Sequence, residues 1–425
     1  MTVDDARPSR RWMWIALPLI LIAVAFRLGA FAFGLRHAPL SSDEAWPSLM
    51  ALHMLKGEFP VVYWGQNYMG TQESFFDAAA IAAFGAHTWT IRLYPLLVSG
   101  LYVAVSVWLA ARVFGRTTAL IVLALLAVPM PYLAMCGALV PPDNYLAVTT
   151  LGGLALVLTH DLLGRPPAAP GTVARCALLG FVLGFTFWMH IIVISVIGVC
   201  GLALLLADRR WPLRWSFWAC GAAFLLGCLP LAMFNAQHHL ATFADVGRTA
   251  PWPRTWDLLH GALTVTFGFL AGTRVMLYPD NANWLPIPAR LGWWVAAIWI
   301  AALGAAALRH LGAHLRLFAL AIRRDAAAPL LTLAGAAALF AFCRSSRSGW
   351  HDARYLLPVT AVLPVLMAEG LRVLGRCGRL VLLAALAVLV VGQVWGNVVL
   401  ARAWRDPHIM GALCLYYTYF PRVYL

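Results

Sequence analysis

The chain has 425 residues, of which 62% are hydrophobic and only 11% are charged, with a formal net charge of +14. Soluble domains carry roughly 25% charged residues, so this composition excludes a soluble globular protein. The apolar runs have the length of membrane-spanning helices and lack the alternation of barrel strands. The arginines lie between these runs and form no single basic face, so nucleic acid is not an expected partner.

Eleven apolar segments predict an all-α fold, a polytopic transmembrane bundle of about 10–11 spans. The first span follows three arginines and has no clear small-residue cleavage site, so we expect it to be retained. The segments are 12–35, 88–111, 117–136, 145–162, 175–190, 191–207, 215–234, 291–308, 329–343, 355–371 and 380–400.

The basic residues predict the orientation, because cytoplasmic loops of membrane proteins are enriched in Lys and Arg. With the N-terminus in the cytoplasm, every second loop is short and basic, and these loops hold 17 of the 31 Lys and Arg residues. Most acidic residues then fall on the outer side, where we expect the chemistry to take place. The predicted location is a bacterial-type cytoplasmic (inner) membrane, with the active site on the outer side.

Two outer loops are long, at about 36–87 and 235–290, and both are expected to carry interfacial helices. The second contains an apolar stretch, Leu258 to Ala271, that fits a re-entrant or interfacial helix. Only about 25 residues follow Leu400, so we expect a single domain over 1–425 without a sizeable C-terminal soluble domain. The eight cysteines contain no CxxC pattern and no metal-like spacing with histidine, so neither a disulfide framework nor a metal site is expected.

Two adjacent carboxylates, Asp43 and Glu44, follow the first span directly after Ser41 and Ser42. One interpretation is structural: a serine caps the next helix and the acids occupy its first turn, where the helix dipole favours anions. The other is catalytic, with a carboxylate acting as general base for an acceptor hydroxyl. The sequence leaves both open.

The same loop contains the polar run Gln66 to Glu73, which is either a solvated loop or a sugar-binding segment. Tyr68 and Glu73 are its candidate binding residues, because they offer stacking and hydrogen bonds. Lys56 is the only lysine of the chain and is either a solvated side chain or a substrate contact.

Two further candidate groups fall on the same predicted side. Asp143 follows Pro141-Pro142, where it either caps the next helix or faces the substrate. The stretch from Arg344 to Pro358 is basic on the outer side, where positive charge is unexpected. Arg344, Arg347 and Arg354 are candidate phosphate ligands, with Tyr355 as a further donor; snorkelling interfacial arginines are the alternative.

These motifs together resemble the GT-C superfamily of integral-membrane glycosyltransferases, especially the protein mannosyltransferase and aminoarabinose transferase group. The resemblance covers most of the chain up to about residue 370. Its elements are Asp43-Glu44 after the first span, Gly70-Thr71-Gln72-Glu73 in the first loop, and Arg354-Tyr355-Leu356-Leu357-Pro358 late in the chain.

The resemblance implies transfer of a hexose or pentose from a polyprenyl-phosphate-linked donor to an acceptor hydroxyl. Asp43 is then the expected base, with Glu44 as a second catalytic candidate, and the region of Arg354 is expected to hold the lipid phosphate. A single base with a phosphate leaving group suits inversion. The expected partners are membrane lipid, the lipid-linked sugar, and an acceptor that is a lipid, a glycan or a protein. No cofactor and no metal site are inferred, and dependence on a divalent metal is left open. The alternatives are a transporter or lipid flippase, or an inactive membrane subunit that keeps the fold.

Overall fold

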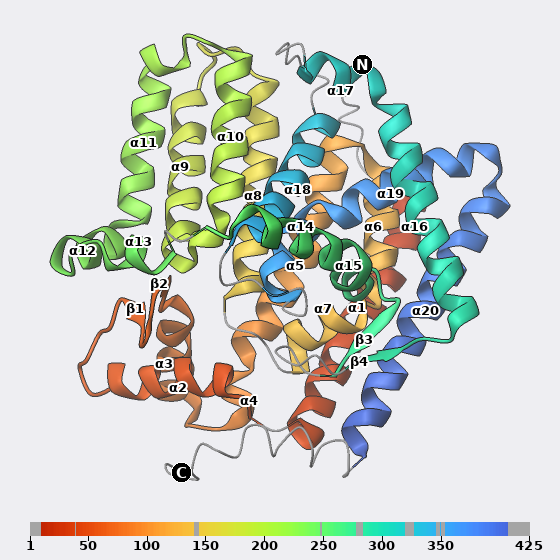
Figure 1. Ribbon diagram of the computed structural model, residues 1–425, viewed down its shortest axis with the longest axis horizontal. Coiled ribbons are helices and arrows are strands. Elements are labelled where there is room, and N and C mark those ends of the chain that lie inside the picture. Colours follow the sequence, from red (N-terminus) through yellow and green to blue (C-terminus); the bar gives the residue numbers. More distant parts are fainter. Residues whose placement is uncertain are drawn as a thin grey trace.

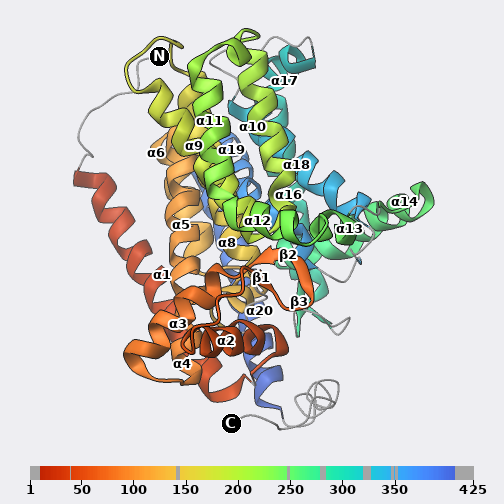
Figure 2. The ribbon, with the colours of Figure 1, turned by 90° about the vertical axis from the view of Figure 1, so that its left-hand side faces the viewer.

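The computed structural model describes residues 10–38, 40–139, 144–246, 249–277, 284–318, 327–345, 349 and 353–406. Over these residues the protein is an upright bundle of helices, and short helices and two small sheets cover part of it (Figure 1). Seen from the side, α2, α3 and strands β1 and β2 gather at one end of the bundle (Figure 2). We call this end, which carries the segment Ser42–Phe84, the first-loop end.

In the described part of the chain, six helical segments are long and apolar enough to cross a membrane. They are α1 (Arg10–His37), α4 (Thr88–Ile91) together with α5 (Leu93–Val113), α8 (Tyr145–Leu163), α9 (Thr172–Met189), α16 (Ala289–Arg309) and α20 (Arg379–Arg405).

Three further spans are bent pairs, and proline explains the bends. Pro131, Pro230 and Pro364 stand at the start of each second helix, where a missing N–H and a fixed φ break the preceding hydrogen-bond ladder. The pairs are α6 (Arg116–Ala127) with α7 (Pro131–Ala134) and the π-helix η1 (Met135–Leu139), α11 (Trp215–Gly227) with α12 (Leu229–Gln237), and the 3₁₀ segment η5 (Ala353–Ala361) with α19 (Leu363–Leu374). Their bends are 73°, 65° and 52°.

Two shorter apolar helices complete the set: η2 (Ile191–Val193) continued by α10 (Ile194–Ala207), and α18 (Ala327–Arg344). These eleven units coincide one by one with the eleven predicted segments, so the all-α, polytopic fold class is confirmed. Short helices in the other connections between these units include η3 (Trp211–Leu213), α17 (Leu311–Phe318) and η6 (Gly375–Cys377).

The first loop folds into α2 (Ser42–Met54), an antiparallel pair of strands, β1 (Val62–Tyr63) and β2 (Gln66–Gly70), and α3 (Gln72–Phe84). Ser41 caps α2: its hydroxyl accepts from the Glu44 N–H at 3.1 Å, and the Glu44 carboxylate accepts from the Ser41 N–H at 2.9 Å. This reciprocal capping box fixes where α2 begins. The structural interpretation of the serine is therefore correct.

The second long loop is also largely helical where it is described. It contains α13 (Ala241–Val246), α14 (Trp252–Gly261), the π-helix η4 (Ala262–Thr266) and α15 (Phe267–Leu270), followed by the antiparallel strands β3 (Arg274–Met276) and β4 (Trp284–Pro286). The apolar stretch singled out in the sequence thus forms helix. Thr242 in α13 donates to the Asn67 carbonyl at 2.6 Å, which ties the second loop to β2.

Helices α9 and α11 approach unusually closely, because glycines face the neighbouring backbone. A Cβ on Gly180 would lie 2.0 Å from the Cys220 carbonyl oxygen, and one on Gly184 would lie 2.0 Å from that of Phe224. Small residues permit such close packing of membrane helices. The close contact holds α9 firmly, and α9 ends at a residue of the candidate site described next.

Candidate active site at the first-loop end

The structure brings Asp43 and Arg354 together although 311 residues separate them in the sequence. The Arg354 NH1 group donates to Asp43 Oδ2 at 3.0 Å, and each side chain is 18% exposed. Asp43 lies in the first turn of α2, and Arg354 lies near the start of η5. The pair joins two of the three motifs that the sequence singled out, and it remains reachable from outside.

Aromatic rings surround the Arg354 guanidinium. Its central carbon lies 5.9 Å from the ring of Tyr145 and 5.3 Å from that of Tyr355, and the two rings meet edge to face at 5.5 Å. An aromatic ring attracts a cation and has few alternative conformations, so these rings hold the positive charge in place. Of these residues the sequence indicated Arg354 and Tyr355 as site residues, but not Tyr145.

Glu44 points away from this pair and has a structural partner. Its carboxylate accepts two hydrogen bonds from Arg92, at 2.5 Å from Nε and 3.1 Å from NH2, and Arg92 also donates to the Gly34 carbonyl at 2.9 Å. Both side chains are buried, with 3% and 1% of their surfaces exposed. Arg92 is thus held in a buried ion pair in the interior of the protein. Glu44 connects α2 to α5, and it is not positioned beside Asp43 and Arg354 to react.

The polar run around β2 is not a solvated loop. Tyr68 and Glu73 are buried at 5% and 4% exposure, and the Tyr63 hydroxyl donates to the Glu73 carboxylate at 3.4 Å. Glu73 thus belongs to the interior of the first loop. Lys56 lies exposed in the turn after α2, whereas Asp143 and Arg347 lie outside the described residues.

Asp77 is a second buried carboxyl in α3, and the sequence did not single it out. It is 1% exposed, and its Oδ2 accepts a hydrogen bond from Ser48 at 3.3 Å. Burial raises the pKa of Asp77 to about 8; the Ser48 hydrogen bond opposes this shift, and the nearby Glu44 charge adds to it. Asp77 is therefore protonated near neutral pH, where Glu44 is paired with Arg92.

His190 is a member of the site that sequence reasoning missed. It ends α9, is 3% exposed, and its ring lies 4.8 Å from that of Tyr145 and 5.4 Å from that of Tyr68. Burial, together with the positive charge of Arg354, lowers the pKa of His190 to about 3. The ring is therefore neutral at any physiological pH. A lone histidine between two apolar runs carries no signal that could have identified it.

The strand β2 is clamped between α8 and α9 next to this histidine. Met69 pairs with His190 in an isolated antiparallel bridge, and the Asn144 side chain donates to the Gly70 carbonyl at 3.0 Å. Gly70 itself has no room for a side chain, since a Cβ would lie 2.5 Å from the Trp188 carbonyl oxygen. Asn144 is the N-cap residue of α8, but its side chain makes no capping hydrogen bond.

Arg344, at the end of α18, is held by the second loop. Its NH1 donates to the Ala250 carbonyl at 2.7 Å and to the Thr255 hydroxyl at 3.2 Å, and its guanidinium covers the Trp252 ring at 4.6 Å. These contacts give Arg344 a structural role that connects α18 and α14.

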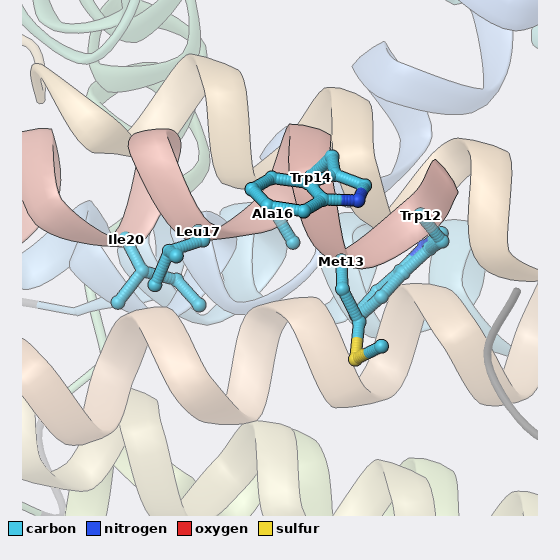
Figure 3. A pocket seen from close by; sticks show the side chains of 6 residues that line it. All are labelled: Trp12, Met13, Trp14, Ala16, Leu17 and Ile20. Carbon is cyan, nitrogen blue, oxygen red and sulfur yellow. The ribbon is translucent and has the colours of Figure 1, made fainter. Parts of the chain in front are cut away.

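An open apolar hollow of about 490 Å³ lies far from the Asp43–Arg354 pair, along the first half of α1 (Figure 3). Its described lining consists of apolar side chains from that helix: Trp12, Met13, Trp14, Ala16, Leu17 and Ile20. Ile20 is the lining residue nearest to the first loop, and about 25 Å of helix, at 1.5 Å per residue, separates it from the end of α1. This lining suits lipid chains, and the hollow is separate from the candidate active site. Within the described ranges, no three or more His, Cys, Asp or Glu residues are grouped so that they could hold a metal ion.

Fold and site together define a polytopic membrane protein with a carboxylate–arginine pair at one end of a helical bundle. The expected resemblance to the GT-C superfamily is confirmed at the level of the fold. The chain is similar to the crystal structure of ArnT from Cupriavidus metallidurans, with a TM-score of 0.61 at 17% identity over 92% of this chain and 77% of ArnT. ArnT bound to undecaprenyl phosphate gives 0.60 at 16% identity, over the same shares of both chains.

The chain is also similar to the archaeal oligosaccharyltransferase AglB from Archaeoglobus fulgidus, in complex with an inhibitory peptide and a dolichol-phosphate. This comparison has a TM-score of 0.52 at 14% identity, over 93% of this chain and 56% of AglB. No protein-family model matches the chain, and no curated protein sequence matches it. The likeness is therefore one of fold.

Proposed function

We propose that the protein is a glycosyltransferase that moves a sugar from a polyprenyl-phosphate-linked donor to an acceptor hydroxyl. The single observation that carries the proposal is the hydrogen bond of 3.0 Å between Asp43 and Arg354. It places a carboxylate and a cation together at a partly open position. The fold adds support, because the similar ArnT and AglB structures are described with undecaprenyl phosphate and dolichol-phosphate.

In the proposed reaction the acceptor oxygen attacks the anomeric carbon, and the bond from that carbon to the phosphate oxygen breaks. The bonding electrons leave with the lipid phosphate, and the hydroxyl proton passes to the Asp43 carboxylate. Arg354 stabilises the negative charge that develops on the leaving phosphate, an electrostatic effect that is often the largest single contribution to catalysis. One displacement with one base gives inversion at the anomeric carbon.

Asp43 and Arg354 can both remain in the site during this reaction. A guanidinium has five N–H donors in a fixed plane, so it can bind a carboxylate and a phosphate oxygen at the same time. Tyr355 and Tyr68 line the same region and remain candidate substrate contacts. Glu44 is withdrawn from the catalytic proposal because its carboxylate pairs with Arg92. Glu73, Lys56, Asp143 and Arg347 remain proposals of the sequence only.

The predicted orientation places this reaction at the outer face of a bacterial-type cytoplasmic membrane, with the N-terminus in the cytoplasm. The distribution of basic residues supports this placement. A protease-accessibility assay on sealed inverted vesicles, with single cleavage sites inserted at Gly57 and Gly312, tests it. Cleavage at Gly312 without cleavage at Gly57 is expected, and the reverse pattern would contradict the proposed orientation.

The test of function is transfer of label from a set of radiolabelled polyprenyl-phosphate sugars in membranes that contain the protein. Asp43→Asn nearly preserves side-chain volume and is expected to abolish transfer at equal protein level. The matched control is Asp257→Asn, the same substitution at an exposed acid of α14. Equal transfer by wild type and Asp43→Asn would remove Asp43 from the mechanism.

The runner-up functions are a lipid flippase or transporter and an inactive subunit. One observation favours the flippase or transporter. Arg27 is buried at 7% exposure inside the span α1. It donates hydrogen bonds to Ser99 at 3.0 Å and to the Leu126 carbonyl at 3.2 Å, next to the bend that follows α6. Ionisable residues and broken helices inside a membrane are typical of transporters. Movement of a fluorescent polyprenyl phosphate across the membrane of vesicles, without sugar transfer, would favour the flippase or transporter. Absence of both activities would favour an inactive subunit.

A further inference from the structure

One N–H group beside the Asp43–Arg354 pair is buried and unused. The Nδ1 atom of His190 accepts a hydrogen bond from the Ile192 N–H at 3.0 Å. A neutral imidazole has one acceptor and one donor nitrogen, so its proton must be on Nε2. This Nε2 is buried and has no hydrogen-bond partner among the described residues.

An unused acceptor belongs to Asn144. Its Nδ2 donates to the Gly70 carbonyl at 3.0 Å, which assigns the two ends of the amide and leaves Oδ1 as the other end. Oδ1 is buried and likewise without a partner in the described part of the chain, and Asn144 as a whole is 0% exposed. Buried polar atoms are nearly always paired in folded proteins, so two such atoms in one site call for a ligand.

The two residues that carry these atoms contact consecutive residues of β2. His190 is bridged to Met69, and Asn144 is bonded to Gly70. Tyr145 follows Asn144 in the chain; its ring contacts the His190 ring and also lies beside the Arg354 guanidinium at 5.9 Å. Both unused groups therefore border the region where the lipid phosphate is proposed to bind.

The chemistry of the two groups defines what they bind. A phosphate oxygen suits an N–H donor, but the Asn144 carbonyl would repel it because both are acceptors. A hydroxyl group donates one hydrogen bond and accepts others, so it satisfies both atoms. The neutral state of the histidine adds no charge for an anion, and the two tyrosine rings that contact it are of the kind that packs against the apolar face of a sugar ring.

We propose that His190 Nε2–H and Asn144 Oδ1 bind a hydroxyl of the sugar that the lipid donor carries. His190 donates to the hydroxyl oxygen, and the hydroxyl hydrogen is donated to Asn144. This assignment rests on the proposed function and makes the pair a determinant of sugar recognition, whereas Arg354 recognises the phosphate.

The test compares the binding of two ligands to purified protein: undecaprenyl phosphate, and the undecaprenyl-phosphate sugar that the wild type transfers fastest. His190→Phe removes the donor, while His190→Gln keeps an amide N–H near the position of Nε2. His190→Phe is expected to weaken binding of the sugar-bearing ligand about tenfold and to leave binding of bare undecaprenyl phosphate unchanged. His190→Gln is expected to weaken the binding of the sugar-bearing ligand by a smaller factor.

The control is Thr159→Val, which removes a buried hydroxyl elsewhere on α8 and should change neither affinity. If His190→Phe weakened the binding of both ligands equally, His190 would bind the phosphate and the assignment would be wrong. If it weakened the binding of neither ligand, His190 would not contact the donor and the assignment would also be wrong. A wild type that transfers no sugar would instead remove the proposed function, and the assignment with it.

A second measurement needs no variant. Monodeoxy analogues of the sugar-bearing ligand are bound to the wild type, and one of them is expected to bind about tenfold more weakly than the parent, because it leaves both protein atoms unpaired. Uniform affinity across all monodeoxy analogues would overturn the assignment.

Discussion

Glu44 and Arg92, 48 residues apart, are joined by two hydrogen bonds of 2.5 and 3.1 Å between buried side chains. Asp43, one residue earlier, faces Arg354 instead. Adjacent carboxylates thus have separate partners, because neighbouring residues in the first turn of a helix point about 100° apart. The consequence is that Glu44 holds the first loop on the bundle, whereas Asp43 pairs with Arg354 at a partly open position.

Glu44→Gln is expected to destabilise the protein, because it leaves the Arg92 charge buried without a counterion. Removing one partner of a buried ion pair costs about 3–5 kcal/mol. Thermal unfolding of purified protein in detergent measures this as a lower midpoint temperature. Asp257→Asn, at an exposed acid of α14, is the control and should change the midpoint little. Equal midpoints for Glu44→Gln and wild type would contradict the structural role of the pair.

Arg354→Gln is expected to lower the transfer rate about 10²- to 10³-fold, the usual effect of removing a group that stabilises developing charge. Arg354→Lys keeps the charge but loses the planar donor geometry, so it should retain part of the activity. The matched control is Arg309→Gln, an exposed arginine at the end of α16. Initial rates with saturating donor measure the effect, and an unchanged rate in Arg354→Gln would place the phosphate elsewhere.

The raised pKa of Asp77 predicts that the free energy of unfolding falls as pH rises. Burial raises its pKa to about 8 in the folded protein, from an ordinary value of 3.8 for an exposed Asp. Below about pH 4 the carboxyl is protonated in both the folded and the unfolded protein, so its burial does not lower the free energy of unfolding through ionisation. Between these pKa values the folded protein retains the proton that the unfolded chain has lost, so the free energy of unfolding falls as pH increases. Above about pH 8 both states are ionised and the penalty stays constant.

Asp77→Asn removes this penalty, which amounts to about 1.4 kcal/mol for each unit between the two pKa values. The variant and the wild type should therefore differ little at pH 4, and the variant should be more stable at pH 9. Denaturant unfolding at the two pH values makes the comparison. A difference between the two proteins that does not depend on pH would show that Asp77 keeps its ordinary pKa.

Gly70→Ala should displace β2 from α9, because the new Cβ would lie 2.5 Å from the Trp188 carbonyl oxygen and 2.7 Å from its indole nitrogen. Backbone must move to relieve the first contact, so both stability and donor binding are expected to fall, the latter because Asn144 and His190 are held by β2. Gly100→Ala is the control: its Cβ meets nothing within 4 Å in helix α5 and should be neutral or slightly stabilising. Unchanged donor binding in Gly70→Ala would contradict the inference that the contact of β2 with α8 and α9 positions Asn144 and His190.

Much of the fold follows from the sequence alone. The apolar segments are long and continuous enough that only membrane helices satisfy their backbone groups, so the order and approximate limits of the apolar helices follow from the sequence, whereas six to nine candidate spans stand where 10–11 were predicted. The capping box was equally readable, because Ser41 and Glu44 lie three residues apart and interact locally. The bends were not predicted, although prolines mark their positions.

The candidate site was only partly readable. The motifs pointed first to Asp43 and Arg354, and in second place to Glu44 and Glu73, which the structure buries in structural contacts. Nothing in the local sequence distinguishes these carboxylates, since their roles depend on partners far along the chain. His190 and Asn144 gave no functional signal for the same reason: their unused atoms are visible only when everything around them is in place.

The sequence by itself determined that this protein is a many-span helical membrane protein with acidic and basic motifs between its spans, because hydropathy and capping act over short stretches of chain. Only the tertiary structure decided which carboxylate meets which cation. Contacts such as Asp43–Arg354 and Glu44–Arg92 depend on how the first loop packs on the bundle, and this packing is set by the side chains of many segments at once.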